Sequence, residues 1–236
     1  MIDLRVGRWQ EALADVGEVD CVCADPPYGD RTHAGNADMQ DRYTRSDLAG
    51  YTHWTPNDAA AFVAAWSDRC RGWFAIMTSD DLITPIRDAF SDNRRLDFAP
   101  VPILQHRPRM GGDGPGSGAV YLMVARPRRK EFLSWGSLPC WYMSQPDKTG
   151  IVNGAKPLSL MLEIVRDYSR PGDTVCDPTS GGATTLIAAH TLGRKSIGAE
   201  MDPVTAAKAQ ARIDRHLRQG TLFEPAAMAV QAKFEV

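Results

Sequence analysis

A short apolar run, residues 19–24, broken only by Asp20, leads directly into the sequence Asp25-Pro26-Pro27-Tyr28. A run of this length bounded by turn residues predicts a buried strand. The tetrapeptide then lies at the strand's carboxyl end, where open α/β sheets bind ligands. Both prolines have φ fixed at about −65° and lack an N–H, so the turn is rigid and its carbonyls are free to accept hydrogen bonds. The corner suits a flat group that carries an NH₂, with Asp25 accepting from the amine and Tyr28 stacking on the ring. The alternative is a strand followed by a turn with a surface tyrosine, and the tetrapeptide alone does not separate the two.

A second segment, residues 171–185, has the pattern of a turn, a strand, a loop of small residues and a helix from about Thr184 to Leu192. Gly181 and Gly182 let the backbone approach a ligand closely. The helix N-terminus presents free N–H groups to the same place. Glu200 ends a further predicted strand about twenty residues later, where dinucleotide-binding folds hold a ribose. The loop lacks the G-x-G-x-x-G spacing and the P-loop lysine, so it predicts a nucleoside ligand without a pyrophosphate.

Helices and strands alternate along the chain. The expected elements include strand 19–24, helix 56–70, strand 73–77, helix 80–90, strands 98–105 and 120–125, and helix 203–217. Such alternation predicts an α/β fold, with a mostly parallel sheet and helices on both faces. One domain, residues 1–218, is expected, with a C-terminal tail of residues 219–236.

Composition limits the setting and the chemistry. The 236 residues contain no apolar stretch near the roughly 18 residues of a membrane span, and the N-terminus lacks a secretory apolar region. A cytoplasmic protein without membrane contact is therefore expected. The five cysteines have no disulfide pattern, and Cys21 and Cys23 alternate on one strand face, which favours core packing. No histidine or cysteine cluster has zinc spacing, so no catalytic metal is predicted.

The two segments together resemble the β class of DNA amino-methyltransferases, which use S-adenosylmethionine to modify the exocyclic nitrogen of adenine or cytosine. The D-P-P-Y motif precedes the D-P-x-x-G motif, an order circularly permuted relative to most methyltransferases. Lys156-Pro157-Leu158 resembles the family's K-P-x-x-L segment beside the methionine moiety, and residues 197–202 resemble its acidic ribose clamp. The resemblance covers most of residues 4–217 and implies a Rossmann-like methyltransferase fold in a bacterial or phage-encoded protein.

The resemblance implies a role for each motif. Asp25, Pro26, Pro27 and Tyr28 form the catalytic corner, in which Asp25 and the Pro26 carbonyl accept from the amine of a flipped base and Tyr28 stacks on it. Aspartate at the first position resembles the adenine enzymes, whereas serine is commoner in those that modify cytosine N4. Adenine N6 is therefore favoured, and cytosine N4 is the alternative. The residues implied for S-adenosylmethionine binding are Cys23, Ala24, Lys156, Pro157, Asp177, Pro178, Thr179, Gly181, Gly182, Thr184, Thr185, Glu200 and Asp202.

The cofactor loop departs from the family's D-P-F-x-G-S-G-T-T at two positions. Thr179 replaces the aromatic residue, and Ala183 replaces the last glycine, where a Cβ disfavours φ > 0. Weaker cofactor binding is one expected consequence, and a non-catalytic nucleoside- or DNA-binding module is a rival interpretation. RNA and protein-glutamine methyltransferases share a P-P-Y corner but resemble the unpermuted order, with the cofactor loop first.

Double-stranded DNA is the partner that the resemblance implies, although the formal net charge of −2 is not a basic footprint. Residues 29–55 are either a lid or DNA-contact loop or a surface insertion, and the two are equally favoured. Residues 126–155 occupy the place of a target-recognition segment and are short for that task. The cations expected at the DNA backbone, each with a solvated surface as its alternative, are Arg31, Arg42, Arg45, Arg107, Arg109, Arg128, Arg129 and Lys130.

The tail contains a second resemblance. Its segment from Gln219 to Phe223 is similar to the Q-x-x-L-F peptides by which bacterial proteins dock on the replication sliding clamp. Gln219, Leu222 and Phe223 are then the contact residues. The alternative, favoured about three to one, is that Leu222 and Phe223 pack on the core. A homodimer is the other assembly considered.

Overall fold

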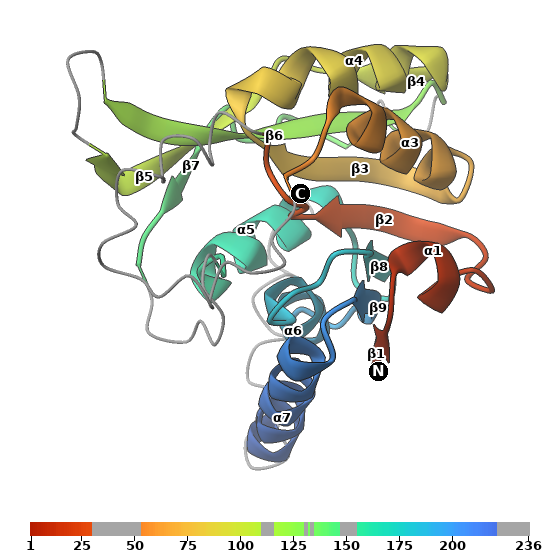
Figure 1. Cartoon of the computed structure of the whole chain (residues 1–236), viewed down its shortest axis with the longest axis vertical. Helices are drawn as coiled ribbons and strands as arrows, with labels where there is room; N and C mark the ends of the chain where they lie inside the picture. The colour runs from red at the N-terminus through yellow and green to blue at the C-terminus, as the bar shows by residue number, and fades with distance from the viewer. Residues whose placement is uncertain (30–52, 110–115, 130–131, 133–134, 147–154, 221–236) are drawn as a thin grey trace, which may run out of the picture.

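The computed structural model describes residues 1–29, 53–109, 116–129, 132, 135–146 and 155–220 (Figure 1). A nine-stranded sheet of order β1-β9-β8-β2-β3-β6-β5-β7, with β4 paired to β6, forms its centre. The strands are β1 (Ile2–Val6), β2 (Val19–Ala24), β3 (Cys70–Thr78), β4 (Arg95–Asp97), β5 (Val101–Arg109), β6 (Ser117–Pro127), β7 (Tyr142–Ser144), β8 (Thr174–Asp177) and β9 (Lys195–Glu200). The helices are α1 (Trp9–Ala12), α3 (Pro56–Ser67), α4 (Ile83–Asp92), α5 (Leu158–Tyr168), α6 (Thr184–Thr191) and α7 (Pro203–Gly220), with a 3₁₀ turn at Asp80–Leu82.

The sheet is parallel over the half that carries both motifs. β1, β9, β8, β2 and β3 are neighbours and run parallel. β6 runs antiparallel to β3, β4 and β5, and β7 pairs with β5 in parallel. The predicted α/β class with a mostly parallel sheet is confirmed.

Helices cover both faces of this sheet, as predicted (Figure 1). α3 and α4 pack on one face in a cluster that includes Val22 and Ala24 of β2. α5 and α6 pack on the other face in a cluster that includes Cys21 and Cys23. Alternate side chains of a strand point to opposite faces. Because helices cover both faces, Cys21, Val22, Cys23 and Ala24 are all buried, and β2 therefore has a nearly continuous apolar sequence. The predicted core packing of the two cysteines is confirmed.

α3 begins where the sequence predicts and ends earlier. Thr55 caps it in a capping box with Asp58, and Pro56 stands in its first turn. The prediction that this helix continues to Cys70 is wrong. Buried Arg95, from β4, donates to the carbonyls of Ser67 at 3.0 Å and Cys70 at 2.9 Å. These bonds satisfy carbonyls where the helix stops, and Cys70 opens β3 instead.

Several short elements were not predicted from the sequence. β1, β4 and β7 each depend on a neighbouring strand, because β1 pairs with β9, β4 with β6 and β7 with β5. α7 also runs past its predicted end at Leu217 to Gly220, so Gln219 lies in that helix. Leu222 and Phe223 lie outside the described residues. None of the helices in the described part of the chain is long and apolar enough to cross a membrane.

Candidate active site

The two motifs meet at one edge of the sheet. β2 and β8 are parallel neighbours, with Cys21 opposite Val175 and Val22 opposite Cys176. Asp25 therefore follows β2 on the same edge at which Asp177 ends β8. The chain continues from β8 to β9 on one side and from β2 to β3 on the other, so this edge is a topological switch point, where α/β sheets form binding crevices.

Asp25 lies at the centre of a polar cluster at that edge. The Lys156 Nζ donates to Asp25 Oδ1 at 2.8 Å and to Oδ2 at 2.6 Å. The Tyr28 hydroxyl donates to Asp25 Oδ1 at 3.0 Å. The same ammonium lies 4.9 Å from the centre of the Tyr28 ring. The side chains of Lys156 and Asp25 are 15% and 22% exposed, so the pair is shielded from water but reachable.

The ends of neighbouring segments hold the corner in place. The Gly29 N–H donates to Ser79 Oγ at 3.0 Å, just after β3. The Trp54 N–H donates to the Tyr28 carbonyl at 3.0 Å, which brings the two described ends of residues 29–55 together. A Cβ at Gly29 would overlap the Asp81 carboxylate as it stands, so a larger residue here would require that side chain to move. The Asp25–Tyr28 turn is thus fixed from several directions.

The loop after β8 is held to β9. The Ser180 N–H and Oγ both donate to the Ala199 carbonyl, at 2.9 and 3.0 Å. The Thr179 N–H donates to Asp177 Oδ1 at 3.1 Å and closes a local turn. Ala183, which stands where the family has glycine, adopts the left-handed conformation at φ 62°, a strained one for a residue with a Cβ. Ala183 thus has a backbone conformation that glycine adopts more readily.

Gly181 leaves space above this loop. A Cβ built on Gly181, which has φ +48°, would meet no atom within 4 Å. Glu200 ends β9 beside it, and its Oε1 accepts from the Asp202 N–H at 2.7 Å. Burial raises the pKa of Glu200, while hydrogen bonds from backbone N–H groups, including that of Gly181, lower it. The open space and the half-buried carboxylate fit the sugar of a nucleoside ligand.

The remaining cofactor residues implied by the resemblance take different positions. Asp202 caps α7, its Oδ2 accepting from the Thr205 N–H at 2.9 Å, and this hydrogen bonding lowers the pKa of Asp202. Lys156 directs its ammonium at Asp25. Several other residues implied for cofactor binding have buried side chains, so they would contact a ligand through their main-chain atoms. These residues are Cys23, Ala24, Pro157, Pro178, Thr184 and Thr185.

Arg212 is a positioning residue that the sequence analysis missed. It projects from α7, is 7% exposed, and its Nη1 donates to the Gly182 carbonyl and to Thr184 Oγ1, both at 2.8 Å. It therefore ties the glycine loop to the helix behind it. Its position in the sequence could have indicated this role, because Arg212 lies on the same face of α7 as the buried residues Ala209 and Ile213. A cation that faces the core is rarely buried without partners.

The comparisons with known proteins agree with this geometry. A family model described as DNA methylase matches residues 127–211. The type II methyltransferase M.BglI of Bacillus subtilis is 33% identical over 75 residues, which is 32% of this chain and 22% of that protein. M.MthZI of Methanothermobacter thermautotrophicus is 41% identical over 103 residues, 39% of this chain and 29% of that protein.

Solved structures share the fold over nearly the whole chain. The M1.HpyAVI–SAM complex superimposes with a TM-score of 0.68 at 19% identity, covering 91% of this chain and 100% of that one. The PvuII DNA methyltransferase, described as cytosine-N4-specific, gives a TM-score of 0.64 at 13% identity and covers 89% and 86%. The fold is the one that these methyltransferase structures share, and the family model covers the part of the chain that holds the Asp177 loop and Glu200. The chain spans under a third of the length of the curated relatives it matches, so activity and substrate do not follow from those matches.

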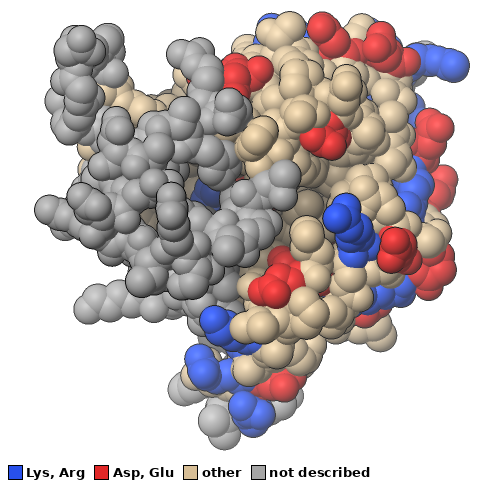
Figure 2. Space-filling model, in the orientation of Figure 1, with Lys and Arg blue, Asp and Glu red and all other residues tan. Residues whose placement is uncertain are grey.

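On this methyltransferase fold, the residues predicted to contact DNA are only partly described. Arg128 and Arg129 are exposed just after β6. Arg107 and Arg109 lie on β5, but their side chains are outside the described part of the structure, as are Arg31, Arg42, Arg45 and Lys130. Figure 2 shows acidic and basic side chains intermixed over the described part of one face.

Two aromatic side chains of the segment 126–155, those of Trp135 and Tyr142, pack against the core. The ring of Trp135 lies 5.9 Å from that of buried Trp73, and its indole N–H donates to the Asp167 carbonyl at 2.9 Å. Tyr142 is 2% exposed and donates to Asp167 Oδ2 at 2.8 Å, whereas Trp141 is 52% exposed. Trp141 is therefore the tryptophan of this segment that is best placed to meet a ligand.

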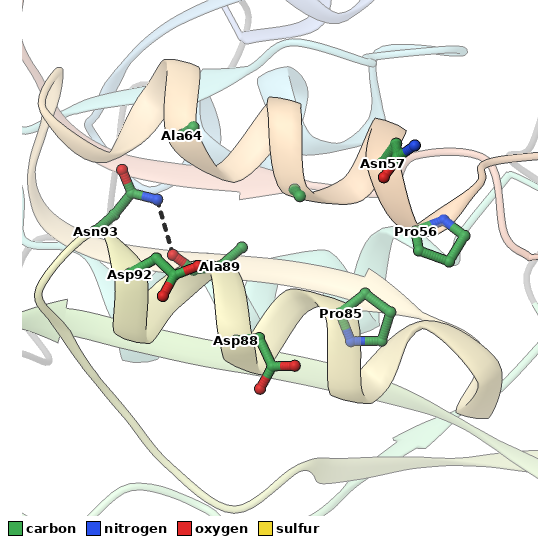
Figure 3. Close-up of a pocket in the computed structure, with 9 residues that line it drawn as sticks. Pro56, Asn57, Ala64, Pro85, Asp88, Ala89, Asp92 and Asn93 are labelled. Atoms are coloured by element: carbon green, nitrogen blue, oxygen red, sulfur yellow. Dashed lines mark hydrogen bonds between the residues drawn. The ribbon is translucent and has the colours of Figure 1, made fainter.

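A separate groove of about 520 Å³ lies between α3 and α4 (Figure 3). Pro56 and Ala60 line it from α3, and Pro85 and Asp88 line it from α4. It includes none of the motif residues and has few groups suited to chemistry. We place the candidate site at the strand ends instead, where the charged and aromatic side chains converge.

Asp177 gives the fold a testable pH dependence. Burial raises the pKa of Asp177 to about 7, and hydrogen bonds from Thr185 and Thr179 only partly oppose this. Because the folded state then holds a proton that the unfolded state has released, the free energy of unfolding falls as pH rises from about 4 to 7. Asp177→Asn cannot titrate, so wild type should lose stability relative to it by up to roughly 1.4 kcal/mol per pH unit. Denaturant unfolding at pH 5, 6, 7 and 8 measures the difference, and parallel pH curves would contradict it.

Proposed function

We propose that this chain transfers a methyl group from S-adenosylmethionine to the exocyclic amine of a base in double-stranded DNA, with adenine N6 as the favoured target. The observation that carries the proposal is the placement of Asp25 and Tyr28 beside the Asp177 loop at one sheet edge. An acceptor for an amine, a ring for stacking and an open nucleoside cradle are thereby brought together. The match to the DNA methylase family supports DNA as the substrate.

The chain's own residues supply orientation and electrostatics. The lone pair of an aromatic amine is delocalised into its ring, so the amine is a poor nucleophile. Asp25, as an ionised acceptor, draws the amine's hydrogens and favours the tetrahedral nitrogen that forms in the transition state. The Pro26 carbonyl is a second acceptor on the same rigid turn. Tyr28 holds the flipped base by stacking, which fixes its amine against Asp25.

The cradle for the cofactor consists of the Gly181 and Gly182 backbone, Glu200 and the Asp177 turn. Gly181 offers open space, and Glu200 offers a carboxylate oxygen for the ribose hydroxyls. S-adenosylmethionine, when bound, supplies an electrophilic methyl group that needs no metal or acid to leave. The protein's task is therefore to bring the base amine into line with that methyl group.

Cytosine N4 is the second candidate target. The PvuII enzyme, whose description states cytosine-N4 specificity, has the same fold. Adenine is favoured because Asp25, rather than serine, stands at the first position of the motif.

The test is a methyl-transfer assay with labelled S-adenosylmethionine and unmethylated double-stranded DNA of mixed sequence, followed by digestion to nucleosides and mass spectrometry. N6-methyladenine is the expected product, and N4-methylcytosine would support the second candidate. RNA and a protein extract serve as alternative acceptors in parallel reactions. Cofactor binding without transfer to any acceptor would overturn the proposal in favour of a binding module.

Glu200→Ala should weaken S-adenosylmethionine binding by about 1 to 3 kcal/mol, the range for a lost hydrogen bond to a charged group. Titration calorimetry measures it. Asp214→Ala is the matched control, because that carboxylate lies on exposed α7 outside the motifs and accepts from the Gln210 side chain at 2.8 Å. Its loss should leave affinity nearly unchanged. Equal affinity for wild type and Glu200→Ala would remove Glu200 from the cradle.

A further inference from the structure

Lys156 does more in this structure than its motif suggests. The K-P-x-x-L resemblance places it beside the methionine moiety, yet its Nζ bridges both carboxylate oxygens of Asp25 at 2.8 and 2.6 Å. The ion pair lies next to the Tyr28 ring, and the Lys156 Nζ is 4.9 Å from the centre of that ring. A base stacked on Tyr28 with its amine at Asp25 would therefore bring the neighbouring atoms of its edge to Lys156.

Hydrogen-bond capacity leaves room for the base. A carboxylate has about four acceptor positions. Lys156 and Tyr28 use both on Oδ1, and Lys156 uses one on Oδ2, so Oδ2 can still accept from an amine. An ammonium has three hydrogens, of which two donate to Asp25. Within the described part of the chain, the third donates to no other residue. The pair therefore presents an acceptor and a donor side by side.

That arrangement matches the edge of an amino base. Adenine carries an N6 donor next to the N1 acceptor, and cytosine carries an N4 donor next to the N3 acceptor. Guanine and thymine present a carbonyl acceptor next to an N–H donor, so the carboxylate would face an oxygen and the ammonium would face an N–H. Mismatches of this kind leave polar groups unpaired, which is costly in a shielded site.

We propose that Lys156 is a base-contacting specificity residue, whose Nζ donates to the ring nitrogen beside the target amine while Asp25 accepts from the amine itself. This rests on the proposed function. In the free protein the ammonium also neutralises Asp25, which keeps a shielded carboxylate paired until the base arrives.

The experiment compares two bases and three proteins on a duplex oligonucleotide containing the methylated site. At that site the adenine is replaced by 1-deazaadenine, which has a C–H in place of N1. The enzymes are wild type, Lys156→Met, which keeps the length of the stem, and Lys156→Arg, which keeps a donor. A duplex with 7-deazaadenine controls for changes away from this edge, and Lys208→Met, on exposed α7, controls for loss of a lysine. If cytosine is the methylated base, 3-deazacytosine takes the place of 1-deazaadenine.

Wild type should lose about 10- to 100-fold in kcat/KM on 1-deazaadenine, the effect of one hydrogen bond to a charged group. Lys156→Met should lose a similar factor on adenine and show no further loss on 1-deazaadenine. Lys156→Arg should retain part of the discrimination. S-adenosylmethionine affinity of Lys156→Met, measured by calorimetry, should stay within about threefold of wild type.

Two results would overturn the inference. One is Lys156→Met that still discriminates against 1-deazaadenine as wild type does. The other is a tenfold or greater loss of S-adenosylmethionine affinity with discrimination intact, which would return Lys156 to the cofactor. If Lys156→Met fails to fold, the wild-type protein decides the test. Equal wild-type rates on adenine and 1-deazaadenine would then overturn the inference. A wild type inactive on the natural duplex would instead count against the proposed function.

Discussion

Replacing Asp25 by alanine is expected to lower kcat by at least about 100- to 1000-fold, the range for removing one preorganised electrostatic group from an active site. S-adenosylmethionine affinity should change by less than about threefold, because the carboxylate acts chiefly on the transition state. The Asp177 loop and Glu200 lie on other strands and should remain in place. Single-turnover methyl transfer measures the rate, and calorimetry measures the affinity.

Two variants sharpen this result. Asp25→Asn keeps an oxygen acceptor but loses the charge, so its rate should lie between those of wild type and Asp25→Ala. Asp97→Ala removes another carboxylate that is paired with a cation, Arg87 at 3.2 Å, on β4 away from the motif ends. It should leave the rate unchanged. An Asp25→Ala protein that transfers methyl at the wild-type rate would rule out the proposed mechanism.

Gly198→Ala is expected to destabilise the fold by about 3 kcal/mol, the upper range for overpacking a well-packed position. Gly198 of β9 lies opposite Asp177 of β8. A Cβ there would stand 2.6 Å from the Asp177 carbonyl oxygen and 3.1 Å from atoms of Leu186 and Ser180. Because the carbonyl belongs to the sheet backbone, β8 would have to move, and the cofactor loop would move with it. Reduced cofactor affinity should accompany the loss of stability.

Gly17→Ala is the matched control, because a Cβ at Gly17 meets nothing within 4 Å. Its effect on the free energy of unfolding should stay within about 0.5 kcal/mol. Denaturant unfolding of both variants makes the comparison. Equal stabilities for Gly198→Ala and Gly17→Ala would show that β8 and β9 adjust to the extra methyl group.

The sequence predicted those parts of the site that depend on local patterns. The apolar run before Asp25 marked β2 at its observed bounds, Val19–Ala24, because burial on both faces favours a nearly continuous apolar sequence, broken here only by Asp20. The loop of small residues after Asp177 marked the start of α6, because close packing and left-handed turns require small residues there. Motif order was enough to indicate the methyltransferase family, since each motif carries its chemistry within a few residues.

Only the tertiary structure decided which distant residues complete the site. Arg212 reaches the glycine loop from α7, and Lys156 reaches Asp25 from the segment just before α5. β1 and β7 became evident only in the structure, where β1 pairs with β9 and β7 pairs with β5. A long side chain can point in many directions, so its partner follows from the packing of whole elements rather than from its neighbours in sequence. The sequence therefore determined the two motifs, and the folded sheet determined that the Lys156 ammonium pairs with the Asp25 carboxylate at the end of β2.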